Sequence, residues 1–420
     1  MNAKRPTILV TDAGRGSAIS IIRALGRKGW RVIAADTDAQ SLGFRSRYAA
    51  DTLLYPDPET HTCEVVDALY EGAQKKQVDL IIPVTDALIL PLAQARQRFA
   101  EVCQLALPDD AGLAVVTNKR ATLQLAEKLG VPIPQTILVH TVEEAAAAAQ
   151  KLSWPAVLKP LASRVHHQAG GTRGFKVSYA NSPAELVKKM ESYAGHCPVL
   201  LQEYYAGVGQ GVELLMNKGK PLAVFQHKRL SEVPVQGGAS ALRESVPLDP
   251  ELYDYSLRLL GEIQWTGLAM VEFKVGAAGP KLMEINGRVW GSLPLAVHSG
   301  VDFPARLVDL YLGVTPPPVI SNGAVGHSAY RADYKIGVRS RNFDLESTWI
   351  LAVLYGKRRH AFLPMPSRRE GLVAFLNLFN PRTKYDILSW DDPAPGWGEM
   401  GKVLRKQRAK LQNLKSNDEE

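Results

Sequence analysis

Two strand-like segments joined by a short turn constrain the fold of this chain more than any other feature. The segments are residues 271–274 and 282–288, and residues 276–280 between them are Gly-Ala-Ala-Gly-Pro. Glycine and proline between two such segments are typical of a β-hairpin. The pattern therefore predicts two adjacent antiparallel strands.

The polar side chains of this hairpin suit a divalent cation. Side chains alternate along a strand, so Glu284, Asn286 and Arg288 are expected on one face. With Glu272 from the neighbouring strand, Glu284 and Asn286 supply hard oxygen ligands of the kind that Mg²⁺ prefers. The Arg288 guanidinium can hold a phosphoryl or acyl-phosphate oxygen bidentately. These residues alone leave open an ordinary hairpin with a polar face.

The segment from Met283 to Arg288, followed by Gly291 and Ser292, resembles the metal-binding strand of the ATP-grasp superfamily. The usual family form has proline where this chain has Gly287. The resemblance covers roughly residues 5–316. It implies an enzyme that uses ATP and Mg²⁺ or Mn²⁺ to activate a carboxylate as an acyl phosphate. The implied metal ligands are Glu272, Glu284 and Asn286.

Two lysines and a glycine-rich loop match the family's phosphate-binding elements. Lys119 begins a helical run, and Lys159 ends an apolar strand at residues 155–160, where burial is costly unless the lysine meets an anion. Gly170 and Gly171 begin a loop whose backbone N–H groups can face phosphates. The resemblance implies that all four bind ATP, whereas solvated lysines and a flexible hairpin tip are the alternatives.

Residues 199–205 resemble the linker between the two ATP-grasp lobes, near 200–206. The resemblance implies that this segment contacts adenine and that Glu213 contacts the ribose. Simple strand polarity also accounts for the acidic residues. The implied contacts in the linker are Gln202, Glu203, Tyr204 and Tyr205.

A basic strand carries the clue to the substrate. His227, Lys228 and Arg229 end the segment 225–230, and Arg243 follows a Gly-Gly-x-Ser loop. Similar carboxylate–amine ligases place such residues at the γ-phosphate, so any of them could receive a substrate carboxylate or stabilise the acyl phosphate. Together with Arg288, the candidate catalytic residues are Arg243, His227 and Lys228. A surface hairpin with acidic counter-ions is the alternative.

The first region alternates strands and helices, which predicts a βαβ arrangement and a parallel sheet. Gly14 and Gly16 followed by Asp36 resemble a dinucleotide fingerprint, but the third glycine position holds Ile19. NAD binding is therefore disfavoured. Asp86 follows a strand at residues 78–83, where parallel sheets place ligands.

The predicted fold class is α/β followed by α+β. It comprises a Rossmann-like pre-ATP-grasp domain with a parallel sheet (residues 1–115), a two-lobed ATP-grasp domain (116–316) and a basic, partly helical C-terminal extension (317–420). Three consecutive prolines at 316–318 mark the second boundary. Within the extension, helices are expected at 345–355, 369–379 and 401–414, with a proline-rich turn at 391–397.

Charge and cysteine content limit the partners. Residues 325–420 hold 17 Lys or Arg and 11 Asp or Glu, and so most of the net charge of +8. Such a region can contact an acidic partner or a membrane surface, although a solvated helix face is more common. The sequence contains no nucleic-acid-binding motif, so we do not expect nucleic acid as a partner.

Three widely spaced cysteines (Cys63, Cys103 and Cys197) predict small buried residues in a reducing compartment. Because no signal-peptide or membrane-spanning pattern is evident, we expect a cytoplasmic protein acting on small molecules. A homodimer is compatible with the sequence. The expected activity is ATP-dependent ligation of a carboxylate to an amine. Carboxyphosphate or carbamoyl-phosphate chemistry and a nonenzymatic ATP-binding scaffold are the alternatives.

Overall fold

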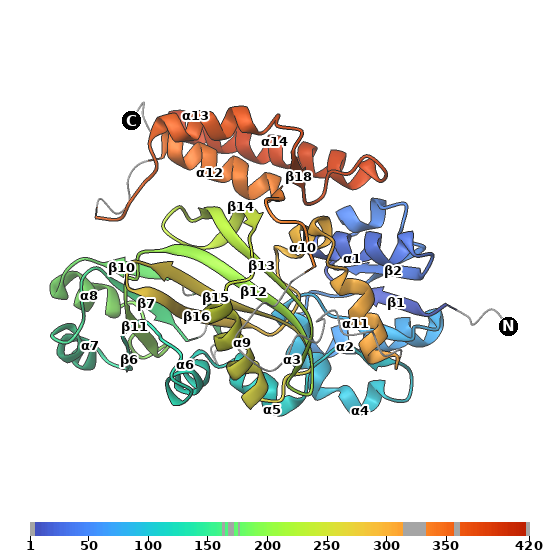
Figure 1. Cartoon of the computed structure of the whole chain (residues 1–420), viewed down its shortest axis with the longest axis horizontal. Helices are drawn as coiled ribbons and strands as arrows, with labels where there is room; N and C mark the ends of the chain where they lie inside the picture. The colour runs from blue at the N-terminus through green and yellow to red at the C-terminus, as the bar shows by residue number, and fades with distance from the viewer. Residues whose placement is uncertain are drawn as a thin grey trace.

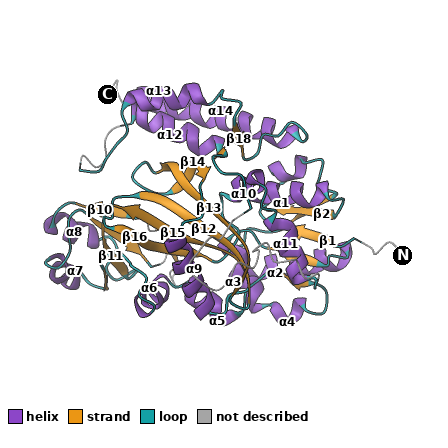
Figure 2. Cartoon of the chain, in the orientation of Figure 1, coloured by secondary structure: helices purple, strands orange, loops and turns teal. Residues whose placement is uncertain are grey.

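The computed structural model describes residues 5–161, 164–166, 172–174, 177–313, 333–356 and 362–416. Figures 1 and 2 show a parallel sheet with its helices at one end of the molecule, a small sheet at the other end, and a large antiparallel sheet between them. A layer of C-terminal helices covers one side of this assembly. The predicted fold class is confirmed.

The N-terminal sheet is parallel, with strand order β3-β2-β1-β4-β5. Its central strands are continuous apolar runs, as is typical of parallel strands covered on both faces. The strands are β1 (Thr7–Val10), β2 (Arg31–Asp36), β3 (Asp51–Leu54), β4 (Leu80–Ile82) and β5 (Gln104–Leu105). The helices are α1 (Gly16–Arg27), η1 (Leu42–Arg45), α2 (Thr62–Lys76), α3 (Asp86–Gln94), α4 (Arg96–Phe99) and α5 (Asp110–Val116).

The small sheet has the order β10-β7-β11-β6, and its helices α7 and α8 contact one another. The strands are β6 (Thr136–Val139), β7 (Ala156–Pro160), β10 (Ser178–Ala180) and β11 (Val199–Glu203). The helices of this part are α6 (Lys119–Lys128), α7 (Val142–Ala149) and α8 (Pro183–Met190), and β8 (Arg164–His166) pairs with β9 (Thr172–Gly174). Asn118 caps α6 by accepting hydrogen bonds from two backbone N–H groups, and it thereby fixes where Lys119 begins the helix.

The large sheet has the order β16-β15-β12-β13-β14-β17-β18. The predicted hairpin is present as β15 and β16, which pair antiparallel. The strands are β12 (Val208–Asn217), β13 (Lys220–Val233), β14 (Ala239–Ser245), β15 (Gly267–Gly276), β16 (Gly279–Asn286), β17 (Arg339–Arg341) and β18 (Thr383–Tyr385). The helices that follow or interrupt these strands are α9 (Pro250–Glu262), α10 (Leu293–Ser299) and α11 (Phe303–Tyr311).

The described part of the C-terminal extension contributes two strands and three helices. The helices are α12 (Phe343–Tyr355), α13 (Arg368–Asn377) and α14 (Pro393–Ser416). The turn expected at 391–397 is wrong from residue 393 onward, because α14 already begins at Pro393 and proline is tolerated in a first helical turn. The strands β17 and β18 extend the large sheet beyond β14, so the extension is continuous with the central part of the fold.

Buried ion pairs hold the extension in place, and two of the three described here join it to the rest of the protein. We call them the extension pairs: Arg243–Asp386, Arg341–Glu346 (which lies within the extension) and Arg23–Asp392. The first links β14 to the segment after β18, and the third links α1 of the N-terminal sheet to the segment before α14. Every side chain in these pairs is 5% exposed or less. The extension therefore braces the N-terminal and large sheets together.

Cysteine burial follows the prediction only in part. Cys103 and Cys197 are buried, whereas Cys63 is exposed on α2. Cys63 lies in the first turn of a helix whose buried residues come later, beginning with Val65. The prediction of three buried thiols is therefore wrong at this position.

Candidate active site

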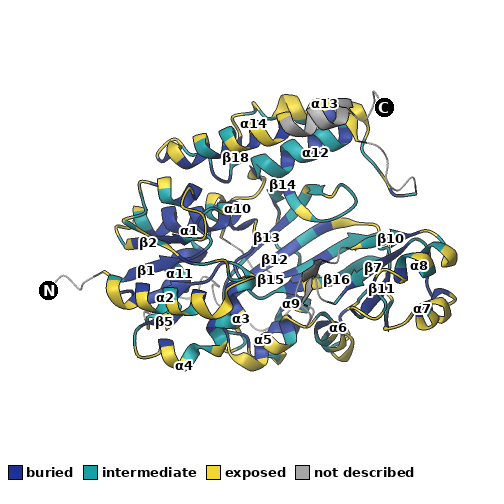
Figure 3. Cartoon of the chain, turned by 180° about the vertical axis from the view of Figure 1, so that it is seen from behind, coloured by how far each residue is buried: buried dark blue, intermediate teal, exposed yellow. Residues whose placement is uncertain are grey.

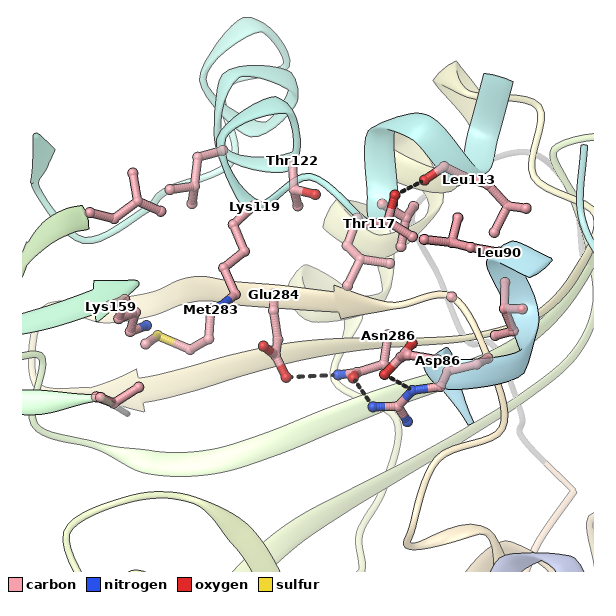
Figure 4. Close-up of a pocket in the computed structure, with 18 of the residues that line it drawn as sticks. Asp86, Leu90, Leu113, Thr117, Lys119, Thr122, Lys159, Met283, Glu284 and Asn286 are labelled. Carbon is pink, nitrogen blue, oxygen red and sulfur yellow. Dashed lines mark hydrogen bonds and ion pairs between the residues drawn. The ribbon is translucent and has the colours of Figure 1, made fainter. Parts of the chain in front are cut away.

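A cavity of about 490 Å³ lies where the N-terminal, small and large sheets approach one another. Its apolar wall comes from α3, α5, α6, β11 and β16, and its polar groups come mainly from the end of β16 and from the two lysine-bearing elements, α6 and β7 (Figure 4). Concave sites with apolar walls and a few converging polar groups are typical of small-molecule pockets. The predicted site residues that line it are Lys119, Lys159, Gln202, Glu284, Asn286 and Arg288.

A hydrogen-bonded row runs from the end of β16 through Arg288, two residues further on, to the N-terminal part of the fold. The Asn286 Nδ2 atom donates to Glu284 Oε1 at 3.0 Å, and Arg288 Nη2 donates to Asn286 Oδ1 at 3.1 Å. Arg288 Nε also donates to the Asp86 carboxylate at 2.7 Å. Figure 4 shows this row beneath Lys119. Asp86, the first residue of α3, thus ties the parallel sheet to the large sheet.

Glu272 lies directly opposite Glu284 in the β15–β16 register, so both carboxylates project from the same sheet face. Burial raises the pKa of Glu272, the nearby Arg229 guanidinium opposes this, and Glu284 raises the pKa further. Two adjacent acids that repel each other, with an amide oxygen from Asn286, make a donor set that a divalent cation fits. The described residues hold no cluster of three or more His, Cys, Asp or Glu arranged for a metal, so the amide is needed to complete this set.

Arg229 supplies a cation beside this donor set. Its guanidinium is paired with Glu272, donates to Glu232 Oε1 at 2.9 Å and donates to the Gly238 carbonyl at 3.0 Å. The side chain is 8% exposed. Arg229 belongs to the basic strand noted in the sequence and is the member of that strand that reaches a candidate metal ligand.

The two lysines approach the same cavity from different elements. Lys119 extends from the start of α6, and its Nζ donates to the Pro160 carbonyl at 3.2 Å. Burial lowers the pKa of Lys159 on β7, Glu284 and Glu272 oppose that shift, and the neighbouring Lys119 adds to it. Like charges held together in a partly buried site favour binding of an anion. Gly170 and Gly171 lie outside the described residues.

Gly287 occupies the position where the family usually has proline, and its surroundings explain the difference. A Cβ atom at Gly287 would lie 2.5 Å from the Trp265 ring and 2.9 Å from Val116 Cγ1. Trp265 is fully buried and lies in the core that is shared by α5 and the large sheet. The glycine therefore allows Trp265 to pack directly beneath the metal-binding strand.

The structure does not bring Arg243 to the cavity, contrary to our expectation. Its guanidinium is 1% exposed and donates to both Asp386 carboxylate oxygens at 2.5 Å. Burying a guanidinium requires a paired carboxylate, and Asp386 supplies it from the extension. We therefore withdraw Arg243 from the substrate site and regard it as one member of an extension pair.

Three further predicted residues also lie away from the cavity lining. His227 and Glu213 are fully buried, with His227 Nδ1 2.9 Å from Glu213 Oε1, and Ser292 Oγ donates to the same oxygen at 3.0 Å. Lys228 pairs with Glu244 at 2.9 Å. The prediction of a ribose contact by Glu213 is therefore not supported by its position, because a buried carboxylate paired within the protein offers no surface to a nucleotide.

Of the predicted linker residues, only Gln202 lines the cavity. Glu203 is paired with Lys281 of β16, and Tyr205 Oη donates to the Gly279 carbonyl at 2.6 Å. The Tyr204 ring lies 5.4 Å from the Lys274 ammonium. These three residues connect the linker to the β15–β16 hairpin, which fixes the two lobes relative to one another.

Sequence reasoning missed several residues that line the cavity. Thr122 follows Lys119 by three residues on α6, so helical spacing could have indicated it. Met283 precedes a predicted metal ligand and could have been considered. No sequence pattern indicated Ile89 and Leu90 on α3 as lining residues, because only the tertiary fold brings that helix to β16.

Comparisons with known proteins agree with this geometry. The profile of a family described as ATP-grasp in the biosynthetic pathway with Ter operon matches residues 196–327. The carbamoyl phosphate synthase large chain of Acidobacterium capsulatum is 22% identical over 278 residues, which cover 64% of this chain and 24% of that protein. A formate-dependent phosphoribosylglycinamide formyltransferase of a Synechococcus species is 29% identical over 187 residues, covering 44% of this chain and 43% of the relative.

A solved structure shows the same fold over most of the chain. The ADP complex of N5-carboxyaminoimidazole ribonucleotide synthetase superposes with a TM-score of 0.61 at 14% identity, covering 90% of this chain and 97% of that one. The fold and the sequence matches together show the ATP-grasp fold, and the resemblance noted in the sequence is confirmed.

The chain spans less than half the length of the two curated relatives described above. Within the described residues, no helix combines the length and apolar character that crossing a bilayer requires.

Proposed function

We propose that this protein is an ATP-dependent ligase that activates a carboxylate as an acyl phosphate and couples it to an amine, releasing ADP and phosphate. The observation that carries the proposal is the cavity that places Lys119 and Lys159 beside Glu284 and Asn286. Cations for a polyphosphate next to oxygen ligands for a divalent cation are what phosphoryl transfer requires.

The nucleotide would occupy the cavity with its phosphates at the lysines. Lys119 and Lys159 bind phosphate oxygens, and the apolar side chains of Leu200 and Met283 line the wall available to the base. Gln202 offers the base a polar contact from the linker side. Its amide Nε2 donates to Thr136 Oγ1 at 2.8 Å, which orients the side chain.

Glu272, Glu284 and Asn286 would hold Mg²⁺ or Mn²⁺. When bound, such a cation neutralises phosphate charge and orients the transferring group. Arg288 binds an oxygen of the transferring phosphoryl group, and Asp86 orients its guanidinium. Arg229, whose buried guanidinium is paired with Glu272 and Glu232, would orient the Glu272 carboxylate toward the cation.

The reaction needs no enzyme nucleophile. A carboxylate oxygen of the substrate attacks the γ-phosphorus and ADP leaves, giving the acyl phosphate. The amine nitrogen then attacks the acyl carbon, phosphate leaves, and the amine loses a proton. The protein's contribution is to hold the reactants and to stabilise the charge that develops on oxygen.

Carboxyphosphate or carbamoyl-phosphate chemistry is the second candidate. It is favoured by the similarity to a carbamoyl phosphate synthase large chain. In that case bicarbonate takes the place of the organic carboxylate at the same site. A nonenzymatic scaffold is less well supported, because the metal-binding acids and both lysines are present.

Phosphate release from ATP tests these candidates. The protein is supplied with Mg-ATP and with amino acids, dipeptides or amino sugars, singly and in pairs, and separately with bicarbonate and ammonia. We expect release that requires an organic acid and an amine together. Release with bicarbonate and ammonia alone would favour the second candidate. A thermal shift with NAD and none with Mg-ATP would overturn both.

Three further proposals accompany this function. The chain divides into domains at residues 1–115, 116–316 and 317–420, and it acts in the cytoplasm on small molecules. We also propose a homodimer, which sedimentation would test.

A further inference from the structure

The helix α13 carries two faces with different packing. Its inner face contains the small residues Gly371 and Ala374 together with Leu378, and it packs against α12. A Cβ atom at Gly371 would lie 2.9 Å from Val353 Cγ1, so the glycine permits a close approach of the two helices. The inner face therefore accounts for how α13 is held on the protein.

The outer face consists of large apolar side chains that the folded chain leaves exposed. Leu372, Phe375, Leu376 and Phe379 are between 45% and 77% exposed. Leu372, Phe375 and Leu376 share one side of α13 through their i, i+3 and i+4 spacing, and Phe379 lies in the turn directly after the helix. The Phe375 and Phe379 rings meet edge to face, with centroids 6.2 Å apart. Figures 1 and 3 place α13 in the layer of helices at the outer edge of the molecule.

The charges around this outer face are mainly basic. Among the described residues 362–390, the exposed acid is Glu370, whose carboxylate accepts hydrogen bonds from the backbone N–H and hydroxyl of Ser367. Asp386 is buried against Arg243. The exposed basic residues that flank the apolar face in the sequence are Arg368, Arg369, Arg382 and Lys384.

We propose that the outer face of α13 docks on the surface of an anionic lipid bilayer. Helices that lie in the membrane interface combine large apolar side chains with Lys or Arg in this way. Leucine and phenylalanine side chains enter the acyl boundary, while the arginines and lysine meet lipid phosphates. Docking would be peripheral and would leave the catalytic cavity on the body of the protein.

Charge also distinguishes a bilayer from a second copy of this chain. A two-fold dimer brings the same patch of both copies together. The basic residues around the patch of one copy would then lie near the basic residues around the patch of the other, with Glu370 as the nearby acid. An anionic bilayer instead supplies a negative charge for each basic residue.

Flotation of the full chain with lipid vesicles tests the proposal. We expect the protein to float with vesicles of phosphatidylcholine and phosphatidylglycerol in equal parts, and much less with phosphatidylcholine alone. Added salt should weaken the binding, because it screens the basic residues. A wild-type protein that stays at the bottom of the gradient with anionic vesicles overturns the proposal.

Variants distinguish vesicle binding by the outer face of α13 from nonspecific binding by other exposed apolar residues. Phe375→Ser combined with Phe379→Ser should lower partitioning onto anionic vesicles at least about tenfold. Leu54→Ser is the matched control, because Leu54 is 53% exposed on β3, far from α13. Circular dichroism checks that both variants fold.

Two outcomes of the variant experiment contradict the proposal. If the wild type and the phenylalanine variant partition equally onto the vesicles, another part of the protein surface binds the lipid. A dimer that sedimentation detects in the wild type and not in the phenylalanine variant, without vesicle binding by either, assigns the face to a second copy. Neither outcome depends on the proposed ligase activity.

Discussion

Arginine–carboxylate pairs occur at the cavity and at the C-terminal extension, and their surroundings differ. At the cavity, Arg288 and Asp86 are 25% and 71% exposed. In the extension pair of Arg243 and Asp386, both side chains are 1% exposed. An exposed pair can exchange its carboxylate for a ligand oxygen at little cost, because such pairs contribute only about 0–1 kcal/mol. A buried pair cannot exchange its carboxylate in this way. The arginine–carboxylate pair therefore serves ligand binding at the cavity and stability in the extension.

The largest expected effect comes from the cavity. Glu284→Gln should remove phosphate release almost completely while leaving the fold intact, because losing a metal ligand removes on the order of several kcal/mol of transition-state stabilisation. Phosphate release at saturating substrate measures this. Glu244→Gln is the control on the same sheet, since Glu244 pairs with Lys228 and Arg339. Release by Glu284→Gln close to the wild-type rate would reject the metal assignment.

A structural effect of similar size is expected at the extension. Asp386→Asn leaves the Arg243 charge buried and uncompensated, and it should lower the free energy of unfolding by about 3–5 kcal/mol. Urea titration measures the loss. Asp391→Asn is the matched control, because Asp391 and its partner Arg27 are both 41% exposed, and it should cost less than about 1 kcal/mol. Equal losses for the two variants would remove the distinction between the two kinds of pair.

Arg288→Lys tests whether the exposed cavity pair acts in chemistry. Lysine keeps the charge and loses the bidentate fork, so kcat should fall by roughly 10- to 100-fold with a small change in nucleotide affinity. Lys159→Ala is the comparison and should weaken ATP binding itself. If Arg288→Lys binds ATP far more weakly and turns over normally at saturation, Arg288 is a ground-state nucleotide contact.

Substitution of Glu399 on α14 should have its smallest effect on stability near pH 4.5, the ordinary pKa of its carboxyl. Burial, with Asp386 and Asp344 nearby, raises the pKa of Glu399 to about 8. The folded protein therefore holds a proton that the unfolded chain has released, and the free energy of unfolding should fall as pH rises from about 4.5 to about 8. Glu399→Gln should leave the free energy of unfolding nearly unchanged at the acid end of this range. The variant should also show a weaker dependence of that free energy on pH. An unchanged slope in the variant would assign the pH dependence to other groups.

The sequence was a good guide where local pattern and site coincide. The hairpin of β15 and β16 follows from its turn residues and alternation, and Lys119 and Lys159 stand at element ends that capping and apolar runs define. Arg243 misled us, because its partner Asp386 is 143 residues away and no local signal connects them. The strands β17 and β18 escaped prediction for the same reason, since each is three residues long and exists only by pairing within the large sheet.

The extension of the large sheet has a consequence for how the chain is made. During synthesis, β14 leaves the ribosome long before β17, so the β14 edge of the large sheet stays unpaired until residue 341 has emerged. Arg243 stays without its counter-charge for longer, until Asp386 has emerged. A nascent chain stalled near the proline run at 316–318 would therefore present an open strand edge beside an uncompensated arginine, and it would be a target for chaperones or for proteolysis.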